Sequence, residues 1–201
     1  KVVTITDSAK QEIEPSEDGP LAALVFKTSA DPYVGKLTYF RVYSGAIDSN
    51  SQVWNATRKG AERIGQLFVL RGKNQETVAR LGAGDMGAVA KLALTNTGDT
   101  LGSQDKPLKV ASIEFPQPAF SLAVHPKTKA DLDKLGAALS RLTEEDPTLE
   151  VHREADTSET IISGIGETHV EVAADKMQRK FGVGVRLETP KVPYKETITA
   201  G

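Results

Sequence analysis

One short motif has glycine spacing that could bind a nucleotide. Residues 82–87 read Gly-Ala-Gly-Asp-Met-Gly and match G-x-G-x-x-G. Such glycines hold a pyrophosphate only when they lie between a strand and a helix, so that the helix N-terminus faces the phosphates. Residues 88–94, however, alternate as a strand does. We therefore predict a turn between two strands here and no nucleotide site.

A second glycine motif, residues 164–166, does lie between a predicted strand and a predicted helix. Backbone amides at a helix start can bind an anion. Glu167 follows at once, and its carboxylate would occupy or repel an anion there. We favour a tight strand-to-helix turn with Glu167 near the positive end of the helix dipole.

The three residues Glu167, His169 and Glu171 could resemble a metal or acid–base cluster. In a helix, positions i and i+2 point about 200° apart, so one face cannot carry His169 with either glutamate. We predict no metal site and interpret His169 as a partly buried or interface histidine. Nearby lysines and an arginine could contact phosphate or simply form a solvated helix face: Lys127, Lys129, Lys134 and Arg153.

The sequence lacks the usual catalytic signatures. It contains no G-x-x-x-x-G-K-[ST] loop, no G-x-S-x-G elbow, no H-E-x-x-H motif and no cysteine. The net charge of −2 predicts no general affinity for nucleic acid, so any RNA contact must use a local patch. No apolar run reaches the roughly 20 residues of a membrane span. We expect no enzyme activity, no metal and no cofactor in this chain, and no membrane partner.

The elements that position these residues fall into two domains. We interpret residues 1–18 as a linker with at most one short strand, and the absence of an initiator methionine suggests an excised piece. Residues 19–106 show a two-residue period broken by Gly and Asx turns, which predicts an antiparallel β-barrel. Its expected strands are 21–27, 36–43, 52–56, 64–70 and 86–94.

The pattern changes after the prolines at 107, 116 and 118. Residues 107–188 predict a βαββαβ order, which is the ferredoxin-like plan. The expected strands are 119–124, 149–153, 160–163 and 183–187, and the expected helices are 128–142 and 167–181. The first helix rests on a stripe of Leu132, Leu135, Leu139 and Leu142, with Thr128 as its cap. The fold class is therefore α+β with two domains.

Several ordered segments resemble the elongation factor G family of translational GTPases, from just after the GTPase domain. The similarity covers about residues 19–198 and departs at Thr168, where the family usually has Leu. The segments that carry it are 19–27, 30–37, 41–45, 83–89, 97–101, 126–131, 142–148 and 160–171. The resemblance implies the second and third domains of the family, with residues 189–201 leading to the C-terminal domains.

What the resemblance implies about function concerns the ribosome. The parent would be a cytoplasmic translocation factor that binds GTP and Mg²⁺ in a separate GTPase domain. The barrel would rest on small-subunit ribosomal RNA, and the third domain would touch a small-subunit protein and the GTPase domain. Thr148 and His169 match positions that line the fusidic acid pocket of the family. Possible RNA contacts are Lys36, Arg41, Lys127 and Lys129. We expect the chain to be monomeric.

Two alternatives stay open at this point. A ribosomal protection protein of the same superfamily would share these domains, although residues 31–35 favour the translocase. A free-standing RNA-binding module is the alternative from another class, because ferredoxin-like sheets often present aromatics to bases. The predicted strands 149–153 and 160–163 contain no aromatic residue, which argues against that module.

Overall fold

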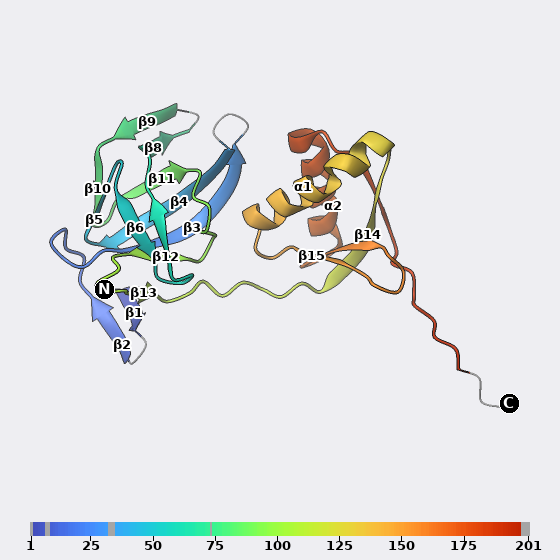
Figure 1. Ribbon diagram of the computed structural model, residues 1–201, viewed down its shortest axis with the longest axis horizontal. Coiled ribbons are helices and arrows are strands. Elements are labelled where there is room, and N and C mark those ends of the chain that lie inside the picture. The colour runs from blue at the N-terminus through green and yellow to red at the C-terminus, as the bar shows by residue number, and fades with distance from the viewer. Residues whose placement is uncertain (1, 7–8, 32–34, 73, 198–201) are drawn as a thin grey trace. The chain divides into compact units, whose positions relative to one another are not determined.

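The computed structural model describes residues 2–6, 9–31, 35–72 and 74–197. The chain divides into two compact units, residues 1–114 and residues 115–201, which are described separately here. Figure 1 shows strands throughout the first unit, and both helices of the described chain in the second.

The first unit is an antiparallel β-barrel. Its main sheet has the strand order β7-β6-β12-β3-β4-β11-β8-β9, and β5 pairs with β10 in a second, two-stranded sheet. Two backbone hydrogen bonds link the β5–β6 turn to the β7–β8 connection: the Asn50 amide donates to the Gly65 carbonyl, and the Ile64 amide donates to the Ser51 carbonyl. The strands are β3 (Ala22–Asp31), β4 (Gly35–Ser44), β5 (Ala46–Asp48), β6 (Gln52–Asn55), β7 (Gly60–Arg63), β8 (Leu67–Arg71), β9 (Asn74–Val78), β10 (Arg80–Gly82), β11 (Met86–Ala90) and β12 (Thr100–Gly102).

Alternation along the strands places the barrel core. In β4, Phe40 and Val42 are fully buried, whereas Tyr39 and Tyr43 on the opposite face are partly exposed. This alternation follows from the two-residue period of a strand. The main core consists of Ala23, Val25, Phe40, Val42, Ile47, Val53, Ile64, Leu67, Leu81, Val89, Leu92 and Leu101. The expected strand 86–94 ends at Ala90 because Lys91 adopts a positive φ of 65°.

The segment before the barrel differs from the predicted linker. It forms two strands instead of at most one: β1 (Val2–Thr6) and β2 (Ala9–Ile13). They form a three-stranded sheet with β13 (Lys109–Val110) in the order β13-β1-β2. Residues 107–114, which we assigned to the second domain, therefore lie in the first unit, and the division falls after Glu114. Pairing of β1 with a strand more than a hundred residues away leaves no local sequence signal.

The second unit has the predicted βαββαβ order. Its sheet is antiparallel with strand order β15-β16-β14-β17, so the first and third strands are central, as the ferredoxin-like plan requires. The elements are β14 (Phe120–Pro126), α1 (Lys129–Glu145), β15 (Glu150–Arg153), β16 (Thr160–Gly164), α2 (Glu167–Lys176), a π-helical turn η1 (Met177–Phe181) and β17 (Val185–Glu188).

The first helix begins where the sequence predicted. Thr128 caps α1, because its hydroxyl accepts from the Asp131 amide while the Asp131 carboxylate accepts from the Thr128 amide. The hydrogen bonds from Thr128 and from the Gly184 amide hold the pKa of Asp131 below its usual range. This carboxylate therefore caps the helix and also ties it to the turn before β17.

One residue of the predicted leucine stripe does not enter the core. Leu135, Leu139 and Leu142 are buried, but the side chain of Leu132 is 57% exposed. Leu132 lies in the first turn of α1, at the edge of the buried stripe, and it borders a groove of about 460 Å³ between α1 and β15. In the described residues, no helix is long and apolar enough to cross a membrane.

Candidate functional site

The best-defined polar cluster in the second unit joins the end of α1 to the start of α2. It consists of Asp146, Thr148 and His169, which we call the His169 cluster. Oδ1 of Asp146 accepts the Thr148 amide at 3.0 Å and the Thr148 hydroxyl at 2.5 Å. Oδ2 of the same carboxylate lies 2.9 Å from Nε2 of His169, which is 23 residues further along the chain. One carboxylate thus connects two segments that are distant in sequence.

The local sequence dictates the geometry around Asp146. Pro147 lacks an amide hydrogen and cannot continue a helix, so α1 ends at Glu145 and Asp146 takes an extended conformation as its C-cap. The Asp146 amide still donates to the Leu142 carbonyl, and the Leu149 amide donates to the Asp146 carbonyl at 3.1 Å. An Asp side chain that accepts the amide two residues on is a common turn-forming device.

The orientation of His169 follows from its two ring nitrogens. Nδ1 accepts the Ile165 amide at 3.2 Å, so the proton of a neutral ring lies on Nε2, which donates to Asp146. We assign this tautomer from the hydrogen-bond partners. Gly164 makes room for the ring, since a Cβ at that position would lie 2.7 Å from Nδ1.

The electrostatics of the cluster favour a charged Asp146. Burial raises the pKa of Asp146, but the hydrogen bonds from Thr148 and His169 outweigh burial and leave the pKa below its ordinary value. The side chains remain partly accessible, with 19% of His169 and 26% of Asp146 exposed. Both ring nitrogens already have partners within the protein, so neither is free to take a proton from a substrate as a general base would.

The structure brings together the two residues that were predicted to line a ligand pocket. Thr148 and His169 share the carboxylate of Asp146, a residue that our sequence reasoning did not select. The available signal was an Asp directly before Pro147, four residues after the predicted helix 128–142. The prediction of a partly buried His169 is confirmed.

The four predicted RNA-contacting cations are divided equally between the two units. Lys36 and Arg41 both lie on β4; Nζ of Lys36 donates to the Asn96 side chain at 2.8 Å, while Arg41 stacks on Tyr43. Lys127 and Lys129 lie in the second unit, exposed beside the N-terminus of α1. The Gly184 carbonyl accepts the Lys127 amide at 2.9 Å, so the backbone there is fixed while the side chain reaches solvent.

The glycine motifs adopt the turns that we favoured. Residues 82–87 connect β10 to β11, with the Asp85 carboxylate accepting the Gly82 amide at 2.9 Å and Gly84 at a φ of 101°. A strand follows this turn, so no helix N-terminus faces its amides. Residues 164–166 form the short turn between β16 and α2, where His169 takes the Ile165 amide.

Comparison with known proteins assigns each unit to a family. A model of elongation factor G domain 2 matches residues 20–104, and a model of elongation factor G domain III matches residues 115–189. A crystal structure of a protein from Thermus thermophilus is 36% identical in sequence, with a TM-score of 0.78. That match covers 88% of this chain and 26% of the Thermus chain, so this chain spans about a quarter of its length.

These matches and the fold define a class and then a family. A translation-factor β-barrel followed by a ferredoxin-like unit is the architecture of a translation elongation factor. The chain belongs to the elongation factor G family and carries its second and third domains.

Proposed function

We propose that this chain is the coupling portion of a ribosomal translocation factor. In this role the barrel contacts small-subunit ribosomal RNA, and the second unit contacts a small-subunit protein and a GTPase domain in a longer protein. The coupling changes with the nucleotide state because the GTPase domain contacts its neighbours differently when GTP is bound. The observation that carries the proposal is the ordered match of both units to consecutive domains of one family.

GTP binding and hydrolysis belong to the GTPase domain in this proposal. Two features of the described residues support this division: the G-x-G-x-x-G turn leads into the strand β11, and the start of α1 is capped by its own Thr128 and Asp131. We expect no enzyme activity from the chain by itself. We also expect the chain to be monomeric and the protein to work in the cytoplasm.

The test compares the 201-residue chain with the longer protein. We expect the longer protein to bind GTP and ribosomes, and the chain alone to show no measurable GTP affinity and weak or no ribosome binding. Equilibrium binding of labelled GTP and co-sedimentation with ribosomes measure both quantities. Tight GTP binding by the chain alone would contradict the proposal.

The His169 cluster forms one wall of the fusidic acid pocket in this proposal. The support is that Thr148 and His169 are locked in place by one carboxylate and remain partly exposed. In the longer protein, Asp146→Ala frees both side chains and should weaken inhibition of ribosome turnover by the drug. Uninhibited GTP hydrolysis should stay near its starting rate, and an unchanged inhibition curve would remove this role.

A further inference from the structure

The outer surface of the barrel carries aromatic and basic side chains side by side. Strand alternation sends Phe40 and Val42 into the core and Tyr39 and Arg41 outward. The register of the sheet places Lys27 and Ala88 opposite Tyr39 on its two neighbouring strands. The outward residues of β3, β4, β11 and β8 that form the aromatic face are Phe26, Lys27, Tyr39, Arg41, Phe68 and Met86.

A β-bulge brings an extra ring to this face. The pairing of β3 with β4 shifts between Val25 and Lys27, so Phe26 is the additional residue and is 39% exposed. Its ring centroid lies 6.4 Å from that of Tyr39. Farther along the sheet, Ala88 on β11 pairs with Tyr39 on one side and with Phe68 on the other. The small Ala88 side chain therefore lies between the two rings.

Two cations lie directly against the rings. Nζ of Lys27 is 5.6 Å from the centroid of Tyr39, and Cζ of Arg41 is 5.7 Å from the centroid of Tyr43. Met86, opposite Arg41, is 59% exposed and extends the apolar part of the face. The stretches of β3, β4, β8 and β11 whose side chains the structure describes contain no Asp or Glu: residues 22–30, 36–44, 67–71 and 86–90.

This combination matches the chemistry of an unpaired nucleotide. A base stacks on an aromatic ring, whereas its phosphate needs a cation within a few ångströms, and proteins that bind single strands supply both. A duplex keeps its bases stacked inside and offers only phosphates and groove edges. The lack of carboxylates in these stretches favours a polyanion over a mixed-charge protein surface.

We infer that the aromatic face binds unpaired nucleotides of RNA, with a base stacked on Tyr39 and the adjoining phosphates held by Lys27 and Arg41. The inference rests on the proposed function, in which the barrel lies on ribosomal RNA, and it specifies the form of RNA and the strands that contact it. The Lys27 ammonium leaves the ring when the base stacks and then pairs with phosphate.

The test uses the full chain and a labelled nine-nucleotide RNA, either single-stranded or annealed to its complement, followed by fluorescence anisotropy at low salt. Tyr39→Leu should weaken binding of the single strand at least about fivefold, because stacking of one base is lost. Lys27→Gln and Arg41→Gln should also weaken binding and each lower the salt dependence by about one phosphate contact.

Matched controls come from exposed residues elsewhere. Tyr194→Leu removes an 88% exposed aromatic, and Lys106→Gln removes an exposed cation. Both should bind RNA within about twofold of the original chain. Photo-crosslinking with 4-thiouridine RNA should label β3 and β4, and circular dichroism checks that each variant is folded.

The inference is overturned by equal affinity for duplex and single strand, by substitutions on the face that match their controls, or by a crosslink confined to other strands. Binding of small-subunit proteins that Tyr39→Leu abolishes, with no RNA binding, would assign the face to a protein and also overturn it. Co-sedimentation with intact small subunits separates the two proposals. This co-sedimentation uses the longer protein: binding that Tyr39→Leu leaves unchanged supports the proposed function and refutes the inference, whereas no co-sedimentation of the longer protein refutes the proposed function.

Discussion

In the barrel unit, the carboxylate of Glu62 is buried among backbone amides, whereas in the second unit the carboxylate of Asp146 is partly exposed and is held by Thr148 and the ring of His169. Glu62 is 6% exposed and accepts the amides of Ala93, Leu94 and Thr95 at 2.6–3.3 Å. Asp146 is 26% exposed and accepts from Thr148 and His169. Both carboxylates accept several hydrogen bonds, but that of Glu62 is buried whereas that of Asp146 is partly exposed.

The difference separates a buried network from a partly exposed cluster. Glu62, together with the buried Asp99, fixes the segment between β11 and β12, because Asp99 accepts from Asn55, Arg58 and the Asn96 amide. Both carboxylates are buried, so they contribute to stability and shape rather than to contacts with a ligand. The residues of the His169 cluster are instead partly exposed, with the Thr148 hydroxyl and the His169 ring held by hydrogen bonds. We therefore expect substitutions in the barrel network to cost more stability than substitutions in the His169 cluster.

The largest effect should come from Glu62→Ala. Three backbone amides would lose a charged acceptor in a buried site, which we expect to lower the free energy of unfolding by about 3 kcal/mol. Trp54, the only tryptophan, lies on β6 and reports barrel unfolding by fluorescence in urea.

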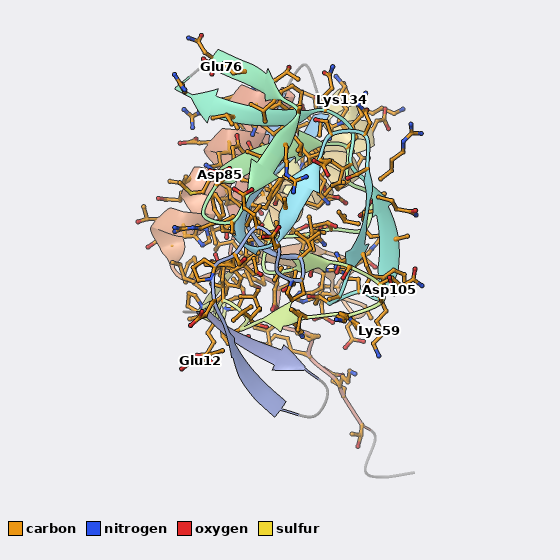
Figure 2. All side chains as sticks on the ribbon, turned by 90° about the vertical axis from the view of Figure 1, so that its left-hand side faces the viewer. Glu12, Lys59, Glu76, Asp85, Asp105 and Lys134 are labelled. Atoms are coloured by element: carbon orange, nitrogen blue, oxygen red, sulfur yellow. The ribbon has the colours of Figure 1, made fainter. Side chains whose placement is uncertain are left out.

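Glu76→Ala on the edge strand β9 is the control for Glu62→Ala. The pair of Glu76 with Arg71 spans 3.7 Å, and 54% of the Glu76 side chain is exposed. Figure 2 shows Glu76 at the opposite end of the barrel from Lys59. A loss below about 1 kcal/mol for Glu62→Ala would remove the distinction between the units.

A smaller loss should follow from Gly164→Ala. The new Cβ would lie 2.7 Å from Nδ1 of His169 and 3.1 Å from Val170, so the ring must shift and break its bond to Ile165. We expect a cost of about 2 kcal/mol to the second unit, followed by far-UV circular dichroism because both described helices belong to it. Gly136→Ala in α1 is the matched control. Nothing lies within 4 Å of its added Cβ, and it should stabilise the helix by about 1 kcal/mol. Equal effects of the two substitutions would refute this account of Gly164.

Asp146→Asn should have a moderate effect that depends on pH. At pH 7 we expect a loss of about 1.5 kcal/mol, because the hydrogen bonds to a charged acceptor become bonds to a neutral one. The folded pKa of Asp146 lies below the unfolded value of about 3.9. The stability from its charge is therefore present above about pH 4 and is lost as the pH falls through the folded pKa.

The original chain and Asp146→Asn should thus converge in stability as the pH falls below the folded pKa of Asp146. Asp175→Asn, on the exposed side of α2, is the comparison that should show no such convergence. Urea unfolding followed at helical wavelengths, repeated from pH 7 downward, measures both. A gap that widens on acidification would contradict the role assigned to Asp146.

The smallest effect concerns which ring nitrogen of His169 carries the proton. We expect it to leave the free energy of unfolding unchanged within measurement. Nitrogen NMR of His169 above pH 7 should show the tautomer with the proton on Nε2, because Nδ1 accepts the Ile165 amide. In Asp146→Asn this preference should weaken, since the charged acceptor is lost. A proton on Nδ1 in the original chain would show that the His169 cluster is arranged differently from the description above.

Much of the architecture was accessible from the residues alone. The two-residue period of 36–43 and the leucine spacing in 128–142 predicted β4 and α1, and Thr128 with Asp131 predicted the capped start of α1. These features depend on neighbours within four residues, where sequence spacing sets side-chain direction. Family resemblance added the pairing of Thr148 with His169 as parts of one site.

What only the tertiary structure decided involves residues distant in the chain. The sheet of β13-β1-β2 joins segments about a hundred residues apart, and Asp146 meets His169 across a whole hairpin. Phe26, Tyr39 and Phe68 share a face only because a bulge and the strand register align them. Register and bulges are set by packing of the entire barrel, so no local pattern specifies which outward residues become neighbours.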